Sequence, residues 1–372
     1  MLMDAAVGRK ARPYGLKPAP WRSWYRGAEV PLYPKSGLGE RREPQSGKEL
    51  WQSKSAIAIL ILAAFCLMCI LICVTMCLPM LGQEPSLTQA QTRNKLLNQL
   101  QSGQLREAVL LGQQGVSRWP RDAELRHYLG IAYFKSGDSK QAKEQLSRAR
   151  ELDPKDSSTH FDLALVSLST ENYAGAADEL EAAIKLDPSN AQAHILLGRA
   201  YLNSNRSLQA IDEFKTSLKL APSIKLGHYH LGFAYFSLGR NDEAIAEYKE
   251  ELRRSGESPA TVYELGRALL GGGKYDAAVT YLQRGAQLDA ANPDVWYNLG
   301  KAQALAGQAA PAESSLRKAI DLNPKDPSPH YQLARVLEKL GKTEDARHER
   351  ETFEELKKSQ PAAAGMATGR DQ

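Results

Sequence analysis

Apolar residues recur with helical spacing along most of this chain, and the pattern itself recurs every 34 residues. Between Ala123 and Asp156, one amphipathic stripe is interrupted at Gly137, and a second such stripe ends before Pro154. Glycine ends a helix readily because it adopts the left-handed conformation, and proline cannot donate the backbone hydrogen bond that would continue one. The pattern therefore predicts two helices joined by a short turn in each 34-residue stretch.

Three columns of identical or nearly identical residues fix the register of this repetition. Position 20 of the repeat is alanine throughout: Ala108, Ala142, Ala176, Ala210, Ala244, Ala278, Ala312 and Ala346. Position 7 is leucine in Leu129, Leu163, Leu197, Leu231, Leu265, Leu299 and Leu333, and position 32 is proline in Pro120, Pro154, Pro188, Pro222 and Pro324. A strict period of this length predicts a stacked repeat protein. The columns place eight repeats, which start at residues 89, 123, 157, 191, 225, 259, 293 and 327.

The small residues of the repeat predict how its two helices meet. Position 8 is glycine or alanine, as in Gly130 and Ala164, which allows close approach of a second helix, and we expect the position-20 alanine to be its counterpart there. A unit this small cannot bury its apolar face alone, so neighbouring units must stack. This pattern resembles the tetratricopeptide repeat family, including Trp296, Leu299 and Gly300 at the start of the seventh repeat. The resemblance covers residues 89–358 and implies an all-α, right-handed α-solenoid of about eight helix-turn-helix repeats.

A membrane anchor is predicted in front of the repeats. Residues 56–81 form an uncharged, apolar run of 26 residues, which as a helix would measure about 39 Å and so exceed the ~30 Å hydrocarbon core of a bilayer. Residues 82–88 are then a short linker. Four cysteines lie on one stripe of this run: Cys66, Cys69, Cys73 and Cys77. We interpret them as small packing residues, with a disulfide-linked helix pair, lipidation or a metal site as alternatives.

The charge around this segment predicts its orientation. Residues 1–55 carry eleven Lys and Arg against five Asp and Glu, together with six prolines, which is typical of a disordered tail. The positive-inside rule keeps such a tail cytoplasmic. The repeats are then expected in the periplasm of a bacterium, or in the lumen or outside the cell in a eukaryote. Residues 359–372 are predicted to be a second disordered tail.

Enzymatic and nucleic-acid functions are disfavoured. The segments outside the repeats are too short for a catalytic domain with its own core. Gly271, Gly272, Gly273 and Lys274 do not complete a phosphate-binding loop, because Tyr275 stands where Ser or Thr is required.

Histidine recurs at position 4 in His160, His194, His228 and His330, and its shared period indicates packing between helices rather than a metal site. No cofactor, metal or small-molecule substrate is predicted. The basic tail accounts for the net charge of +5, so the repeats lack the basic surface of a nucleic-acid-binding protein.

The resemblance implies that the first helix of each repeat lines a concave face, chiefly through positions 2, 5, 9 and 12. Position 5 reads Phe161, Ile195, Tyr229, Tyr263, Tyr297 and Tyr331, and position 9 reads Arg199, Phe233, Arg267, Lys301 and Arg335 in the last five repeats. The predicted partner-binding set is Phe161, Tyr229, Phe233, Phe236, Tyr263, Arg267, Tyr297, Lys301, Tyr331 and Arg335. The alternative is that the aromatic residues pack between neighbouring repeats. The carboxylate clamp of some family members needs lysine at position 5 and asparagine at position 9, and neither occurs here.

Two functions agree with these features. The first is a membrane-anchored interaction scaffold that binds extended peptide segments of partner proteins on the concave face. The predicted ligand has aromatic or aliphatic anchors and acidic groups that face Arg267, Lys301 and Arg335. The second is a periplasmic maturation, secretion or assembly factor that holds unfolded clients, as in cytochrome c maturation.

Overall fold

The computed structural model describes residues 87–359, and every element in this range is an α-helix. The chain divides into two compact bodies at Pro120, and the described residues of each body consist of paired antiparallel helices. The body before this point holds α2 (Gln89–Gln101) and α3 (Leu105–Arg118). The structure therefore bears out an all-α architecture of sixteen helices between residues 87 and 359.

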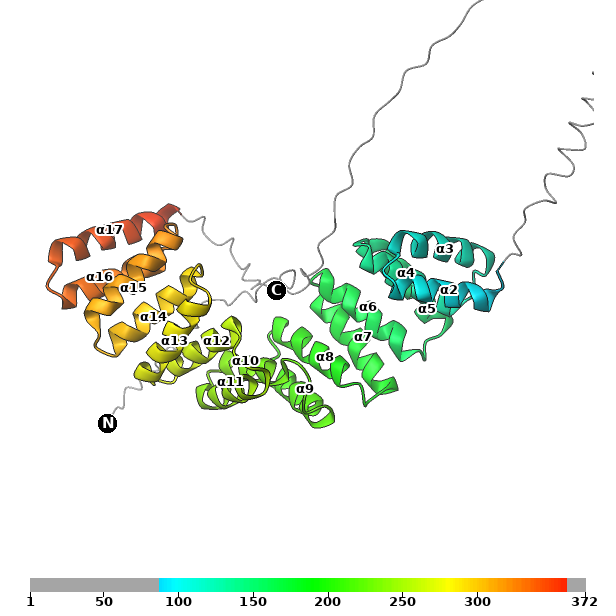
Figure 1. Ribbon diagram of the computed structural model, residues 1–372, viewed down its shortest axis with the longest axis horizontal. Coiled ribbons are helices and arrows are strands. Elements are labelled where there is room, and N and C mark those ends of the chain that lie inside the picture. The colour runs from blue at the N-terminus through cyan, green and yellow to red at the C-terminus, as the bar shows by residue number, and fades with distance from the viewer. Residues whose placement is uncertain (1–86, 360–372) are drawn as a thin grey trace, which may run out of the picture. The chain divides into compact units, whose positions relative to one another are not determined.

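The body that starts at Arg121 holds the other fourteen described helices (Figure 1). They are α4 (Ala123–Lys135), α5 (Ser139–Leu152), α6 (Ser157–Ser169), α7 (Tyr173–Leu186), α8 (Ala191–Asn203), α9 (Ser207–Leu220), α10 (Gly227–Ser237), α11 (Asn241–Ser255), α12 (Pro259–Gly271), α13 (Tyr275–Leu288), α14 (Pro293–Leu305), α15 (Ala309–Leu322), α16 (Pro327–Lys339) and α17 (Thr343–Ser359). Even-numbered helices are the first of each repeat, and odd-numbered helices are the second.

A polar residue at position 34 of the preceding repeat starts most first helices. The side chains of Asp122, Asp156, Asn190, Asn292 and Asp326 each accept a hydrogen bond from a backbone N–H of the first turn. Such caps satisfy N–H groups that have no partner inside the helix.

The fifth repeat has Ile224 at the capping position, where no such bond can form. Its first helix α10 starts late, at Gly227, after Leu226 in the left-handed conformation (φ 61°). A carboxylate oxygen of Glu251 on α11 accepts instead from the N–H of Tyr229 at 3.3 Å.

Position 15, between the two helices of a repeat, adopts the left-handed conformation as the glycine pattern predicts. Gly137, Gly239, Gly273, Gly307 and Gly341 have φ between 73° and 88°. Glu171 and Asn205 occupy the same position with φ 58° and 60°, at the steric cost of a side chain there.

The glycine at position 8 lies mainly against position 24 of the second helix, and the expected neighbour at position 20 is among the nearest atoms at Gly300, where an added Cβ would lie 3.2 Å from the carbonyl oxygen of Ala312. A Cβ added to Gly130 would lie 2.6 Å from Cγ of Leu146, and one on Gly198 would lie 2.5 Å from Cε1 of Phe214. The corresponding glycines Gly232, Gly266 and Gly300 face Tyr248, Leu282 and Leu316. A large side chain at position 24 therefore fills the space that glycine leaves, while the position-20 alanines are buried beside it.

Several apolar clusters form the core of the body after Pro120. Its largest cluster extends from Ala164 on α6 to Ala302 on α14. Each second helix packs on the first helix of the next repeat, and α8, α10, α12, α14 and α16 also contact one another in sequence. The first helices are therefore closely spaced, which places them on the inner side of the stack.

The predicted basic tail and apolar span fall outside the described residues, as do most of the predicted linker and all of the predicted final tail except Ser359, which ends α17. Within residues 87–359, none of the helices combines the length and apolar character needed to span a membrane.

Candidate functional site

The inner face of the stack is the surface that positions 5, 9 and 12 form on α6, α8, α10, α12, α14 and α16. Residues four apart share one side of a helix, so positions 5 and 9 lie one turn apart on the same surface. Because α8, α10, α12, α14 and α16 contact one another in sequence, these positions form columns across neighbouring repeats.

The aromatic residues of position 5 are mostly set into this surface. Phe161, Tyr229 and Tyr263 are partly buried against the main core cluster, and Tyr297 is partly buried against the C-terminal cluster. Tyr331 is 44% exposed, and its ring packs on Phe353 at a centroid distance of 5.3 Å. These side chains therefore contribute to packing between repeats while each remains at least partly exposed.

Position 6 of the next repeat provides polar partners for position 5, a relationship that the sequence analysis missed. The hydroxyl of Tyr263 accepts a hydrogen bond from Nδ2 of Asn298 at 2.9 Å. His127, also at position 5, has Nε2 2.7 Å from a carboxylate oxygen of Asp162. In both pairs the separation is 35 residues. These contacts could have been predicted from the sequence by looking for a polar residue 35 positions after a polar residue at position 5.

Arg267 already has a carboxylate partner inside the protein. Its Nη1 donates to both carboxylate oxygens of Glu264, one turn earlier on α12, at 3.0 and 2.9 Å. Burial raises the pKa of Glu264, and the guanidinium opposes that rise. The guanidinium also lies 4.9 Å from the ring centre of Phe236 and 5.5 Å from that of Tyr263. Phe236, Tyr263 and Arg267 are thus brought together, with the charge of Arg267 largely neutralised.

Lys301 and Arg335 continue the position-9 column. Lys301 is partly buried, and Arg335 is exposed with its guanidinium 5.9 Å from the ring centre of Tyr331. Within the described range, neither side chain lies at ion-pair distance from a carboxylate. Phe233, the position-9 residue of the fifth repeat, is partly buried on α10 against the main core cluster. The inner face therefore offers apolar rings and cations in alternation, which suits apolar and acidic side chains of a ligand.

Arg199 and His230 form a second group on this face that the predicted set omitted. Arg199 on α8 is partly buried, and that burial lowers the pKa of its guanidinium. The ring of His230 lies between Phe214 and Tyr229, each with a centroid distance of 5.6 Å. Burial, and after it the charge of Arg199, lower the pKa of His230 to about 3. At neutral pH the imidazole is therefore uncharged.

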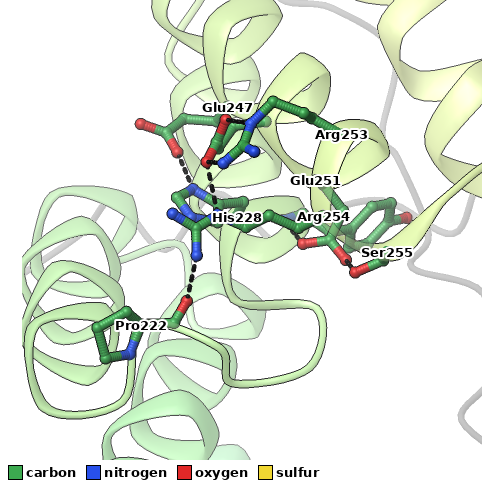
Figure 2. A network of polar contacts seen from close by, with 9 residues as sticks. Pro222, His228, Glu247, Glu251, Arg253, Arg254 and Ser255 are labelled. Atoms are coloured by element: carbon green, nitrogen blue, oxygen red, sulfur yellow. Dashed lines mark hydrogen bonds and ion pairs between the residues drawn. The ribbon is translucent and has the colours of Figure 1, made fainter.

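The position-4 histidines link the two helices of a repeat through contacts with glutamate side chains. Nδ1 of His160, His194 and His330 lies 2.6 to 2.7 Å from a carboxylate oxygen of Glu179, Glu213 and Glu349, respectively. Figure 2 shows the equivalent contact in the fifth repeat, where His228 Nδ1 is 2.7 Å from Glu247 Oε2. The histidines thus contact a glutamate column at position 23 rather than each other, and the described residues contain no cluster suited to a metal ion.

The same close-up shows how the fifth repeat is tied to the fourth. Arg254 on α11 donates to the carbonyl oxygen of Pro222 at 3.0 Å, and Ser255 donates to Glu251 at 2.7 Å (Figure 2). The bond of Arg254 joins α11 to the end of the fourth repeat, while the carboxylate of Glu251 also accepts from the N–H of Tyr229 at the start of α10.

Known families and structures share this repeat. The family model described as "Tetratricopeptide repeat" matches residues 95–157, 127–191, 161–223 and 195–259. Other models described as TPR or tetratricopeptide repeats match residues 266–307, 293–326 and 315–348. Together these segments cover more than half of the chain. No curated protein sequence matches.

Among solved structures, the APC/C hetero-tetramer Cut9–Hcn1 matches with a TM-score of 0.50 at 19% identity, over 73% of this chain and 52% of that chain. The present chain thus spans about half the length of that protein. YrrB, described as a TPR protein with an unusual peptide-binding site, matches with a TM-score of 0.45 at 22% identity, over 50% of this chain and 96% of that one. MamA from Desulfovibrio magneticus RS-1 matches with a TM-score of 0.45 at 21% identity, over 46% and 97%. At these identities the likeness to Cut9–Hcn1 describes the fold alone.

Proposed function

We propose that this chain, which belongs to the tetratricopeptide repeat family, is a protein–protein interaction scaffold that holds extended peptide segments of its partners on the inner face. The observation that carries the proposal is the column of rings and cations at positions 5, 9 and 12. A solenoid needs apolar residues between its helices, but it does not need Phe233 and Phe236 to reach the inner face. Nor does its stability require Lys301 and Arg335, which have no carboxylate partner among residues 87–359.

The width of this face fits a peptide. Neighbouring helices pack about 10 Å apart, so the four successive first helices from α10 to α16 span about 30 Å. An extended segment of about nine residues covers that distance, since each residue adds about 3.3–3.6 Å. The ligand we propose places apolar side chains against Phe233 and Phe236 and acidic side chains near Lys301 and Arg335.

Affinity capture from native membranes tests the proposal. The full chain would be compared with an inner-face variant, Phe233→Gln, Lys301→Gln and Arg335→Gln combined. The control variant changes three exposed residues of second helices: Lys215→Gln, Lys249→Gln and Arg317→Gln. We expect the inner-face variant to lose the partners identified by mass spectrometry while the control keeps them. Equal capture by both variants would move the binding surface away from the inner face.

We further propose that the scaffold is anchored to a membrane by residues 56–81, with its N-terminus cytoplasmic and its repeats on the opposite side. The apolar run and the basic tail in front of it support this arrangement. A reporter fused after residue 372 should be active outside the cytoplasm. A reporter active only in the cytoplasm would reverse the orientation.

The nature of the captured ligands separates scaffolding from a maturation role. A scaffold should retain a few folded partners, whereas a maturation factor should crosslink to many extended chains.

A further inference from the structure

Arg199 is a partly buried cation that forms no ion pair with the part of the chain that the structure describes. It lies at position 9 of the fourth repeat, on α8, in the column of positions that defines the inner face. Among residues 87–359 no carboxylate lies at ion-pair distance from it. A charge that has lost part of its hydration without gaining a partner is unfavourable for the free protein.

Arg267 occupies the same repeat position as Arg199, but its charge is neutralised by a carboxylate. In that repeat Glu264 stands at position 6, three residues before the arginine, and receives both of its short hydrogen bonds. In the repeat of Arg199, position 6 is the buried Leu196. The next repeat offers His230 at position 6, and not a carboxylate.

Two groups that interact electrostatically with Arg199 are uncharged and can take part in hydrogen bonds. The charge of Arg199 acts on the imidazole of His230, on α10, and on the hydroxyl of Tyr173, at the start of α7. Burial raises the pKa of Tyr173 and lowers that of His230, so both are neutral at pH 7. A guanidinium beside a neutral imidazole and a neutral phenol suits a carboxylate, because the fork of N–H groups can bind both of its oxygens.

We propose that Arg199 receives an aspartate or glutamate side chain of the peptide segment that the inner face holds. This inference rests on the proposed function and specifies its ligand. Phe233 occupies the equivalent position on the next first helix, about 10 Å away by the usual helix spacing. About three residues of extended chain cover that distance. The recognised segment therefore has an acidic residue about three positions from an apolar residue.

Selection from a random dodecapeptide display library tests this ligand. The peptides would be displayed inside a longer chain, so that only side-chain carboxylates are offered. The full chain in detergent micelles would be used as wild type, as Arg199→Gln, and as the control Arg148→Gln. Arg148 lies on α5, is 62% exposed and pairs with Glu151, so its loss leaves the inner face unchanged.

Wild type and the Arg148→Gln control should select peptides that share one acidic position and one apolar position about three residues apart. The Arg199→Gln variant should keep the apolar preference and lose the acidic one. For a selected peptide, replacing the acidic residue by its amide should weaken binding to wild type about tenfold or more, as expected for a hydrogen bond between charged groups. The same replacement should change binding to Arg199→Gln less than about twofold, and Arg199→Lys should show an intermediate effect.

The outcomes separate the two proposals. If the selected peptides lack an acidic preference, or if Arg199→Gln retains it, the carboxylate assignment is overturned while peptide binding stands. If none of the three proteins selects any peptide, the proposed function fails and the assignment fails with it. Thermal unfolding of Arg199→Gln by circular dichroism, compared with wild type, confirms that a changed preference is not a loss of fold.

Discussion

Arg199 and Arg267 occupy the same repeat position, two repeats apart, in opposite electrostatic surroundings. Arg267 donates two hydrogen bonds to the buried carboxylate of Glu264, whereas no described carboxylate pairs with Arg199. The contribution of each arginine to stability should therefore have opposite sign, even though both side chains are partly buried.

Replacing each arginine by methionine tests this contrast. Arg199→Met removes a poorly compensated charge and keeps the apolar stem, so the free energy of unfolding should rise by about 1 kcal/mol. Arg267→Met leaves Glu264 buried without its partner and should lower the free energy of unfolding by about 2 kcal/mol. Urea unfolding followed by circular dichroism measures both. A loss of stability in Arg199→Met would mean that the arginine stabilises the free protein and is not held for a ligand.

His230 predicts a specific acid sensitivity. Its pKa falls from 6.5 to about 3 on folding, so between these values the unfolded chain binds a proton that the folded chain does not. Stability therefore rises with pH in this window and is lost as pH falls from 6.5 towards 3. The contribution is at most ~1.4 kcal/mol per pH unit for one group.

Replacing His230 by phenylalanine should remove this slope, since a ring remains between Phe214 and Tyr229. The measurement is the difference in the free energy of unfolding between variant and wild type at pH 7 and at pH 4.5. The variant should gain stability relative to wild type at the lower pH. A difference that does not change with pH would show that His230 is protonated in the folded protein.

Single residues of the candidate face were predictable from the sequence where they depend on the repeat period alone. The aromatic residues of position 5 and the cations of position 9 are visible as columns. The Glu264–Arg267 pair follows from a spacing of three on one helix and could have been predicted. The isolation of Arg199 could not, because it depends on what neighbouring helices bring to its surroundings.

At the scale of the helices, the contact between position 8 and position 24 sets how closely each pair packs. Gly198 touches the ring of Phe214, and Gly266 touches the side chain of Leu282. The sequence analysis recognised the small residue correctly but missed its main partner at position 24. It favoured the unvarying alanine of position 20, but the residue that a glycine accommodates is a large one, and large residues vary more.

Two glycine-to-alanine replacements distinguish close approach from simple helix propensity. A Cβ on Gly198 would lie 2.5 Å from Cε1 of Phe214, so Gly198→Ala should lower the free energy of unfolding by about 1–3 kcal/mol. A Cβ on Gly285, inside α13, meets its nearest atom at 3.4 Å. Gly285→Ala should therefore stabilise the protein by about 0.5–1 kcal/mol through helix propensity. Thermal melts compare the two, and destabilisation by both would refute the distinction.

Helix boundaries were predictable except in the fifth repeat. Position 34 is Asp, Asn or Ser before most first helices, and those helices begin directly after it. The period alone places the start of the fifth repeat at residue 225, but Ile224 cannot cap a helix, and α10 begins two residues later. The chain compensates with the carboxylate of Glu251 from another helix, a long-range contact that no local pattern reveals.

At the scale of the whole molecule, the period of 34 residues is the feature from which the fold follows. Eight repeats without insertion or deletion predict a stack of helix pairs, and the tetratricopeptide repeat models match along it. The identity of the ligand cannot be predicted from the period. That depends on the few positions at which neighbouring repeats differ, such as Arg199, Phe233 and Arg267 in one column.

Site-specific photocrosslinking tests the central claim, that ligands lie on the inner face. A photoreactive phenylalanine analogue would replace Phe233 on α10 in one version of the full chain and the exposed Lys249 on α11 in another. After irradiation in native membranes, partner proteins should be crosslinked through position 233 and not through position 249. Crosslinks through position 249 with none through position 233 would contradict the account and place the partners on the second helices.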